Sequence, residues 1–244
     1  MKKIFSGKQA LVIGGTGGIG RFISRGLAEC GAELTVIGSS AEKMKRTSQE
    51  IKKIGGVINE NILTLEAGSA VDNVLSICRY ADILVCAYGP FKRTALSETT
   101  VEDWHSLVTL NLILPGSLVS SYLGGMMKKK WGRILLFGGT NTDFIRGWTT
   151  TAPYAAAKTA LGPLAKSVAK NASAFGVTCN VLCPGLTDTE YMDNTAKKYN
   201  RENSPAGVTL TPQEVAAFAL DILKNPSING AIVPIDKGVE VHAV

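Results

Sequence analysis

The sequence has few residues of the kinds that bind zinc. Its five cysteines include no CxxC pair, and its two histidines, His105 and His242, lie far apart along the chain. Structural zinc sites usually draw their ligands from closely spaced pairs, so we predict no metal site. Unpaired thiols are also typical of a reducing compartment, which favours a cytoplasmic protein.

Long charge-free stretches and linkers are scarce as well. The longest uncharged run, residues 106–127, contains Asn111, Pro115 and four serines, which indicates a buried helix rather than a membrane span. Near the start, the apolar run LVI is too short for a signal peptide and opens onto glycines. With 45% hydrophobic and 19% charged residues and no low-complexity segment, residues 1–244 are expected to form a single domain.

Acidic residues are outnumbered, and the net charge is +6, but the basic residues are scattered along the chain. The one tight cluster, residues 128–130, is expected to mark a solvated helix end, where cations complement the helix dipole. A positive charge suits nucleic acid, an anionic cofactor or an acidic carrier protein, and does not by itself choose among them. Because nucleic-acid binding would rest on this charge alone, we predict no such partner.

Seven apolar runs recur between stretches of helical character: ALVIGG, ELTVIG, NILTLEAG, DILVCAYG, RILLFGG, VTCNVLCPG and AIVPIDKG. Most are short and do not alternate with polar residues, which indicates strands covered on both faces. The segments between most of them are long enough for crossover helices. We therefore predict an α/β fold, a Rossmann-like, doubly wound parallel sheet of about seven strands, with ligands bound at the carboxyl ends of the strands.

A glycine-rich loop follows the first predicted strand. Gly14, Gly18 and Gly20 are spaced GxxxGxG ahead of a predicted helix. Glycines there let the backbone approach a pyrophosphate, whose charge faces the free amides at the start of the helix. A nucleoside triphosphatase loop is disfavoured, because no GK[ST] follows and Arg21 does not replace that lysine.

The end of the second predicted strand lacks the acidic residue that typically binds the adenosine ribose of NAD. Instead, Ser39 and Ser40 offer hydroxyls, and Lys43 and Arg46 follow within about one helical turn, which would tolerate the extra phosphate of NADP. The alternative is that these residues only cap the next helix. After the third strand, Glu66 is a candidate for the adenine amino group or an ordinary solvated loop residue.

Tyr154 stands four residues before Lys158, a spacing that places both side chains on one face of a helix. The ammonium would then lie near the phenol and favour its ionised form, which makes the pair a candidate acid/base site. A tyrosine that exchanges a proton with a substrate usually works beside a second hydroxyl. Upstream, two glycines are followed by Thr140.

Taken in order, the glycine loop, CAYG, Asn111, YAAAK, NVLCPG, TPQEVA and INGAIVPIDKG resemble the short-chain dehydrogenase/reductase family over nearly the whole chain. Within that family the sequence is most similar to the 3-oxoacyl carrier-protein reductases, with GMMKKKWGRI a local similarity. The resemblance implies an NADP-dependent oxidoreductase, with NAD less favoured, that assembles as a homotetramer.

The resemblance also assigns roles. Tyr154 would be the general acid and base, Lys158 would hold the nicotinamide ribose, and Asn111 would bridge the lysine to a proton-relay water. The alternative for Asn111 is a buried amide that satisfies helix backbone. The cofactor is expected to contact the glycine loop, the strand ends and the catalytic helix, at Gly14, Thr16, Gly17, Gly18, Ile19, Gly20, Ser39, Ser40, Lys43, Glu66, Ala87, Gly89, Asn111, Tyr154, Lys158, Pro184, Gly185 and Thr187.

The sequence departs from the family pattern at three places. CAYG, residues 86–89, replaces the family's NNAG, and the helix expected after Tyr154 contains Pro163, which removes a backbone donor and is expected to kink it. Gly139 stands where the catalytic serine belongs. We predict that Thr140 supplies the missing hydroxyl, with Asn141, Thr142 or no replacement as the alternatives.

The substrate is defined only as a carbonyl compound or secondary alcohol, with a 3-oxoacyl thioester as one candidate. Residues 186–208 are expected to form a lid, whose basic residues (Lys197, Lys198 and Arg201) would suit an acidic acyl carrier or simply be solvated. Against a carrier-protein substrate, Phe175 stands where such reductases commonly have an arginine. The alternative function is a regulatory or structural NAD(P)-binding protein with little catalysis.

Overall fold

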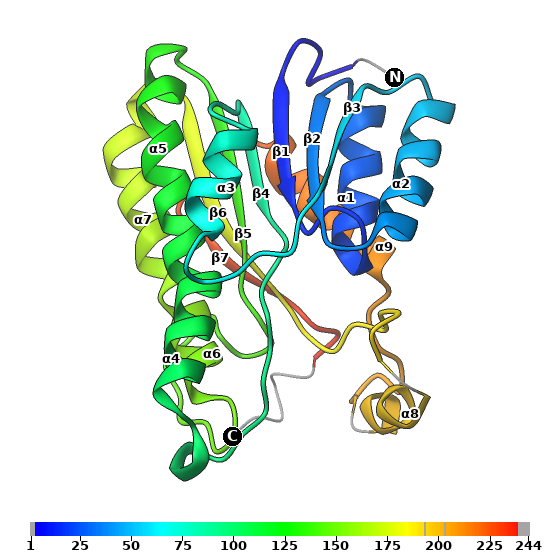
Figure 1. Cartoon of the computed structure of the whole chain (residues 1–244), viewed down its shortest axis with the longest axis vertical. Helices are drawn as coiled ribbons and strands as arrows, with labels where there is room; N and C mark the ends of the chain where they lie inside the picture. Colours follow the sequence, from blue (N-terminus) through cyan, green and yellow to red (C-terminus); the bar gives the residue numbers. More distant parts are fainter. Residues whose placement is uncertain (1–2, 193, 203, 239–244) are drawn as a thin grey trace.

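The computed structural model describes residues 3–192, 194–202 and 204–238. Within these residues, seven strands form one parallel sheet in the order β3-β2-β1-β4-β5-β6-β7, which confirms the predicted fold class (Figure 1). The strands are β1 (Gln9–Ile13), β2 (Glu33–Gly38), β3 (Ile58–Ile62), β4 (Ile83–Cys86), β5 (Gly132–Phe137), β6 (Val177–Pro184) and β7 (Ile232–Ile235).

Helices cover both faces of the sheet (Figure 1). One layer contains α3 (Ala70–Ile77), α5 (Leu114–Lys128) and α7 (Leu161–Ala172), and the other contains α1 (Gly18–Glu29), α2 (Ala41–Lys53) and α9 (Pro212–Lys224). Along β1, Leu11 and Ile13 enter the core under the first layer, while Ala10 and Val12 enter the core under the second. Both faces of the strand are therefore buried, which is why its sequence does not alternate.

The remaining elements lie near the carboxyl ends of the strands or in the loops. They are α4 (Val101–Val108), α6 (Ala152–Thr159), α8 (Asn194–Glu202), the 3₁₀ turns η1 (Leu96–Glu98) and η3 (Ser173–Phe175), and the π-helical turn η2 (Thr109–Ile113). Figure 1 shows α8 standing away from the sheet, on the opposite side of the strand ends from α4 and α6.

The third strand begins earlier than its apolar run predicts. The run NILTLEAG starts at Asn61, whereas β3 spans Ile58–Ile62. This strand forms an edge of the sheet, and its residues Asn59 and Glu60 are exposed. A search for apolar runs therefore misses the polar first half of the strand. Glu60 pairs with Lys52 at 2.7 Å, which holds α2 against the edge.

The uncharged run contributes to one continuous helical segment made of α4, η2 and α5. Of the described residues, this segment, Val101–Lys128, is long and apolar enough to cross a membrane, with a mean hydropathy of 1.4. Half of that window is buried, and core helices of soluble proteins meet the same criterion. Leu118, Val119 and Tyr122 pack into the core beneath the sheet face.

Where a kink is expected from Pro163, the structure has a break between two helices, three residues before the proline. Helix α6 ends at Thr159 and α7 begins at Leu161, with Ala160 between them. Pro163 has no N–H to donate to the carbonyl of Thr159, so the helix cannot run through without losing a bond. The short helix α6 carries Tyr154 and Lys158, and α7 packs separately against β6.

Candidate active site

The glycine loop lies between β1 and α1, and its backbone geometry requires glycine. Gly14 has φ of +76°, and a Cβ built on it would lie 2.9 Å from the carbonyl oxygen of Ala87. The loop lines a cavity of about 470 Å³ at the carboxyl ends of the strands. Of the residues predicted to contact the cofactor, this cavity is lined by Gly14, Thr16, Gly17, Gly18, Ile19, Ser39, Ala87 and Gly89.

A second cavity of about 280 Å³ continues from the first. The two share wall residues at the ends of β4 and β5, including Ala87, Gly89 and Phe137. Among the predicted site residues, the second cavity adds Thr140, Tyr154, Lys158, Pro184, Gly185 and Thr187. The two cavities form one trough, which an extended ligand would occupy from the glycine loop to the tyrosine.

Other residues of the predicted set lie outside this lining. Ser40 caps α2, with its hydroxyl accepting the N–H of Lys43 at 3.3 Å, as the capping alternative predicted. Gly20 is buried beneath the loop, where a Cβ would collide with the carbonyl oxygen of Gly14. Glu66 is exposed, and its carbonyl oxygen accepts the N–H groups of Ser69 and Ala70 in a loop.

Lys158 is buried and donates to the carbonyl oxygen of Phe137 at 2.8 Å. Its Nζ lies 5.8 Å from the centroid of the Tyr154 ring. Burial lowers the pKa of Lys158 to about 8, although the nearby Cys86 and Cys183 act in the opposite direction. For the Cys86 thiol, which is charged when deprotonated, burial raises the pKa to about 12.

The pKa of Tyr154 moves in the direction opposite to our expectation. Burial, followed by the neighbouring Cys183, raises it to about 12. The ammonium of Lys158 points to the backbone of β5, so desolvation of the phenol outweighs the attraction of the cation. A phenol with this pKa stays protonated at neutral pH but is a weaker acid than a free tyrosine.

Asn111 lies in the π-helical turn η2, a geometry that is frequent at functional sites. Its Nδ2 donates to the carbonyl oxygens of Leu107, at 2.9 Å, and Pro90, at 3.0 Å, so the amide does satisfy helix backbone. Within the described part of the chain, its buried Oδ1 has no hydrogen-bond partner. A Cβ built on Gly89 would collide with this oxygen and lie 2.7 Å from Lys158 Nζ, so both polar groups flank Gly89.

The three candidates for the missing hydroxyl occupy different environments. Thr140 lines the second cavity, and its hydroxyl donates to the carbonyl oxygen of Pro184 at 3.3 Å. Thr142 is buried, and its hydroxyl accepts the Gly139 N–H at 2.8 Å and donates to the Gly139 carbonyl at 3.0 Å. Asn141 has φ of +56° and is buried. Of the three, only Thr140 lines this cavity.

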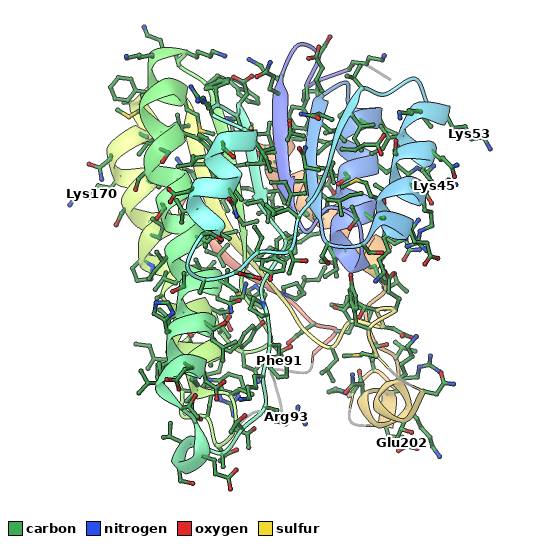
Figure 2. The ribbon with its side chains drawn as sticks, viewed as in Figure 1. Lys45, Lys53, Phe91, Arg93, Lys170 and Glu202 are labelled. Carbon is green, nitrogen blue, oxygen red and sulfur yellow. The ribbon has the colours of Figure 1, made fainter. Side chains whose placement is uncertain are left out.

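Sequence reasoning missed two groups beside the site. The ring of Phe91 meets the ring of Tyr154 edge to face, with centroids 5.0 Å apart. Phe91 is labelled in Figure 2. Glu190, between β6 and α8, pairs with Lys43 at 3.1 Å. Phe91 stands two residues after the CAYG segment, near a strand end, so the rule that ligands bind at strand ends could have identified it. Glu190 carries no comparable signal, because its contact depends on the path of a loop.

A profile described as short chain dehydrogenase matches residues 8–200. The chain is 28% identical over 246 residues to the 3-oxoacyl-(acyl-carrier-protein) reductase FabG of Aquifex aeolicus, covering 96% of this chain and 97% of the relative. It is 31% identical over 226 residues to the reductase of the same name from Vibrio harveyi, covering 90% and 91% of the two chains.

Solved structures point to the same family of proteins. A 3-oxoacyl (acyl-carrier-protein) reductase from Agrobacterium tumefaciens C58 with NADP bound superposes with a TM-score of 0.84 at 28% identity, covering 95% of this chain and 93% of that one. A dehydrogenase/reductase from Sinorhizobium meliloti 1021 gives 0.79 at 27% identity, covering 97% and 98%. The chain belongs to the short-chain dehydrogenase family and is an oxidoreductase of that family.

Proposed function

We propose that the protein is an NADP-dependent carbonyl reductase or secondary-alcohol dehydrogenase. The observation that carries this proposal is the single trough that joins the glycine loop to Tyr154 and Lys158. A protein that only binds a dinucleotide needs the first cavity but has no use for a proton-transfer pair in the second.

The residues along the trough fit a dinucleotide. Gly14, Gly17 and Gly18 line the first cavity without side chains, next to the start of α1, as a pyrophosphate-binding loop requires. At the other end, the unpartnered Oδ1 of Asn111 and the ammonium of Lys158 flank Gly89 and are available for ribose hydroxyls or a relay water. A nicotinamide bound there supplies or accepts the hydride of the reaction.

Tyr154 then acts on the oxygen of the substrate. In reduction the phenol donates its proton to the carbonyl oxygen, and in oxidation the phenolate accepts it back. Thr140 would hold that oxygen by a hydrogen bond once its hydroxyl turns away from Pro184. Lys158 supports both directions with its charge, as its ammonium moves from the carbonyl of Phe137 toward the bound ribose.

NADP is favoured over NAD by the charges at the end of β2. Lys43 and Arg46 lie on the first turns of α2, and β2 is followed by Ser39 and Ser40 rather than by a carboxylate. Charge-assisted hydrogen bonds from these cations would bind a 2′-phosphate. The Agrobacterium relative was solved with NADP bound, which supports the same choice.

The names of the relatives make a 3-oxoacyl thioester the first substrate to test. The positive charge that the lid presents to a carrier protein is smaller than its basic residues alone predicted. Asp188 pairs with Lys197 at 2.8 Å and with Arg201 at 3.0 Å, so its one negative charge offsets part of the charge of these two cations. A small ketone therefore stands beside the thioester as a candidate.

The decisive experiment follows the oxidation of NADPH across ketones, diketones and 3-oxoacyl thioesters, with Tyr154→Phe as the control protein. Turnover of at least one class that is abolished in Tyr154→Phe supports the proposal. Tight NADPH binding with no turnover of any class would favour the regulatory or structural alternative. Turnover that survives in Tyr154→Phe would refute the role of the tyrosine.

We also propose that the protein works in the cytoplasm as a homotetramer built from one domain per chain. Apolar side chains gather on one surface near α4 and α6, including Trp104, Phe144 and Ile145, of which Ile145 is 92% exposed. They line or border a depression of about 680 Å³. Exposed apolar patches of this kind usually mark subunit contacts.

A further inference from the structure

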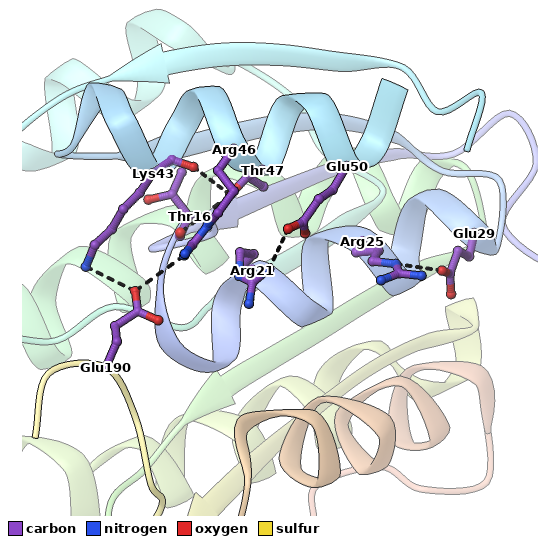
Figure 3. Close-up of polar contacts among 9 residues, drawn as sticks. All are labelled: Thr16, Arg21, Arg25, Glu29, Lys43, Arg46, Thr47, Glu50 and Glu190. Carbon is purple, nitrogen blue, oxygen red and sulfur yellow. Dashed lines mark hydrogen bonds and ion pairs between the residues drawn. The ribbon is translucent and has the colours of Figure 1, made fainter. Parts of the chain in front are cut away.

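Glu190 lies on the segment between β6 and α8, and its side chain reaches across the trough to α2. Its Oε1 is 3.1 Å from Lys43 Nζ and 3.7 Å from an Nη of Arg46 (Figure 3). These two cations are the ones to which the proposed function assigns the 2′-phosphate of NADP. A carboxylate of the protein therefore occupies the place of that phosphate.

The same segment also covers the glycine loop. The backbone N–H of Gly18, at the start of α1, helps to lower the pKa of the Glu190 carboxyl. A Cβ built on Gly17 would lie 3.2 Å from Glu190 Oε1 and would collide with the Tyr191 hydroxyl. Lys43 Nζ sits 4.0 Å from the centroid of the Tyr191 ring, which fixes the ring over the loop.

The carboxyl of Glu190 is ionised in this position. Partial burial acts to raise its pKa, but the hydrogen bonds from Lys43 and Gly18 and the charge of Arg46 outweigh burial, so the pKa lies below its ordinary value. A carboxylate and a phosphate cannot share the same cations and the same helix start, because their charges repel. One must leave before the other binds.

We propose that Glu190 is an internal competitor of the dinucleotide phosphates and a determinant of cofactor selectivity. The inference rests on the proposed binding of NADP in this trough. Displacing Glu190 breaks its pairs with Lys43 and Arg46. The loss of these ion pairs offsets part of the free energy gained when the same cations bind a 2′-phosphate. Glu190 thereby weakens the binding of NADPH more than that of NADH, which has no group to place on Lys43.

The test uses Glu190→Gln, which keeps the shape of the side chain and removes its charge. Glu202→Gln is the matched control, because it makes the same charge change on the lid at an exposed residue, whose ion pair with Lys198 has a distance of 3.7 Å. NADPH, NADH and adenosine 2′,5′-bisphosphate are titrated into each protein by calorimetry, with no substrate present.

We expect Glu190→Gln to bind NADPH and the bisphosphate about fivefold more tightly than the unmodified protein, in line with the loss of a partly exposed ion pair. NADH should gain less, and Glu202→Gln should match the unmodified protein. Equal or weaker binding of the bisphosphate to Glu190→Gln would overturn the inference while leaving the proposed function intact. If the unmodified protein binds neither dinucleotide, the proposed function fails first and the inference falls with it.

A second readout needs no nucleotide. Because Glu190 anchors residues 189–191 to α1 and α2, the backbone amides of this segment should exchange hydrogen faster in Glu190→Gln than in Glu202→Gln. Equal exchange rates in the two variants would show that the carboxylate does not hold the segment in place, which would also overturn the inference.

Discussion

Gly139 lies directly against the hydroxyl of Tyr154: a Cβ built on the glycine would fall 2.7 Å from the phenolic oxygen. This is the position at which the resemblance to the family places a serine, and a side chain there would press against the phenol. The phenol is buried, and burial raises its pKa to about 12.

The contact between Gly139 and Tyr154 can be measured as a coupling. Gly139→Ala should destabilise the protein by about 1–3 kcal/mol through overpacking, since the backbone at Gly139 is not in the left-handed region. In a Tyr154→Phe background the clashing oxygen is gone and the cost should fall by at least about 0.5 kcal/mol. Urea denaturation of the four proteins gives the result, and strictly additive costs would contradict the contact.

Loss of the Thr140 hydroxyl should impair the chemical step. Thr140→Val keeps the β-branched shape and removes the donor to the substrate oxygen, so kcat should fall about a hundredfold while NADPH binding is retained. Tyr154→Phe should be more damaging, because it removes the proton donor. Steady-state kinetics with the best substrate of the screen measures both, and normal turnover of Thr140→Val would move the role to another group.

Thr142→Val is the matched control for Thr140→Val, with a different expected readout. The Thr142 hydroxyl accepts the N–H of Gly139 at 2.8 Å in a buried setting. Valine would leave that N–H unpaired, at a cost of about 1–3 kcal/mol in unfolding free energy. We expect a lower melting temperature for Thr142→Val and no such change for Thr140→Val. A lower melting temperature for Thr140→Val and an unchanged one for Thr142→Val would assign the structural role to Thr140 and the catalytic role to Thr142.

NADPH should bind at least tenfold more tightly than NADH, a difference of about 1.4 kcal/mol, which is within reach of one charged contact. The double variant Lys43→Gln/Arg46→Gln should lose this preference, because it removes both cations at the end of β2. Fluorescence titration of the two cofactors measures each affinity. Equal affinities in the unmodified protein, or a preference for NADH, would rule out the assignment.

The stability of the unliganded protein should rise with pH just above about pH 8. Burial lowers the pKa of Lys158 to about 8, below its ordinary value of 10.5, so above pH 8 the unfolded chain holds more protons at this group than the folded one. By linkage, unfolding free energy then increases with pH. Above about pH 9 the trend is opposed, because burial raises the pKa of Cys86 from 9.0 to about 12.

Denaturation of the protein and of Lys158→Met at two pH values, about 7.5 and 9, isolates this group. The methionine keeps the length of the side chain and cannot titrate, so the variant should lack the increase. A similar increase in both proteins would assign the effect to another residue.

The apolar surface near α4 and α6 should hold subunits together. Ala156, in α6, is exposed and lines the depression described above, so Ala156→Arg would place a charge in the contact and should reduce the mass of the assembly. Ala174→Arg, at an exposed position of η3, is the matched control and should leave the mass unchanged. Light scattering at micromolar concentration measures both, and a monomeric unmodified protein would contradict the tetramer.

Most of the sheet could be predicted because six of its strands carry apolar runs that mark burial. The exception, β3, is an edge strand in which Asn59 and Glu60 face solvent. The spacing of Tyr154 and Lys158 likewise follows from helix geometry alone. The rise in the pKa of Tyr154 could not be predicted from the sequence, because it depends on how far the phenol is desolvated in the folded protein. The contact of Glu190 with α2 could not be predicted either, because it depends on the path of a loop that no local sequence pattern determines.

Cys86 and Cys183, which flank Lys158 at the ends of β4 and β6, are 6% and 0% exposed. A thiol reagent cannot reach Cys183 unless the strand ends separate from the neighbouring helix and loops. Alkylation of Cys183 would therefore report how often this part of the native protein opens by itself, with the rate of labelling setting the free energy of opening when reclosing is fast. The candidate site thus contains its own probe of local opening, a native thiol that needs neither a substrate nor an introduced cysteine.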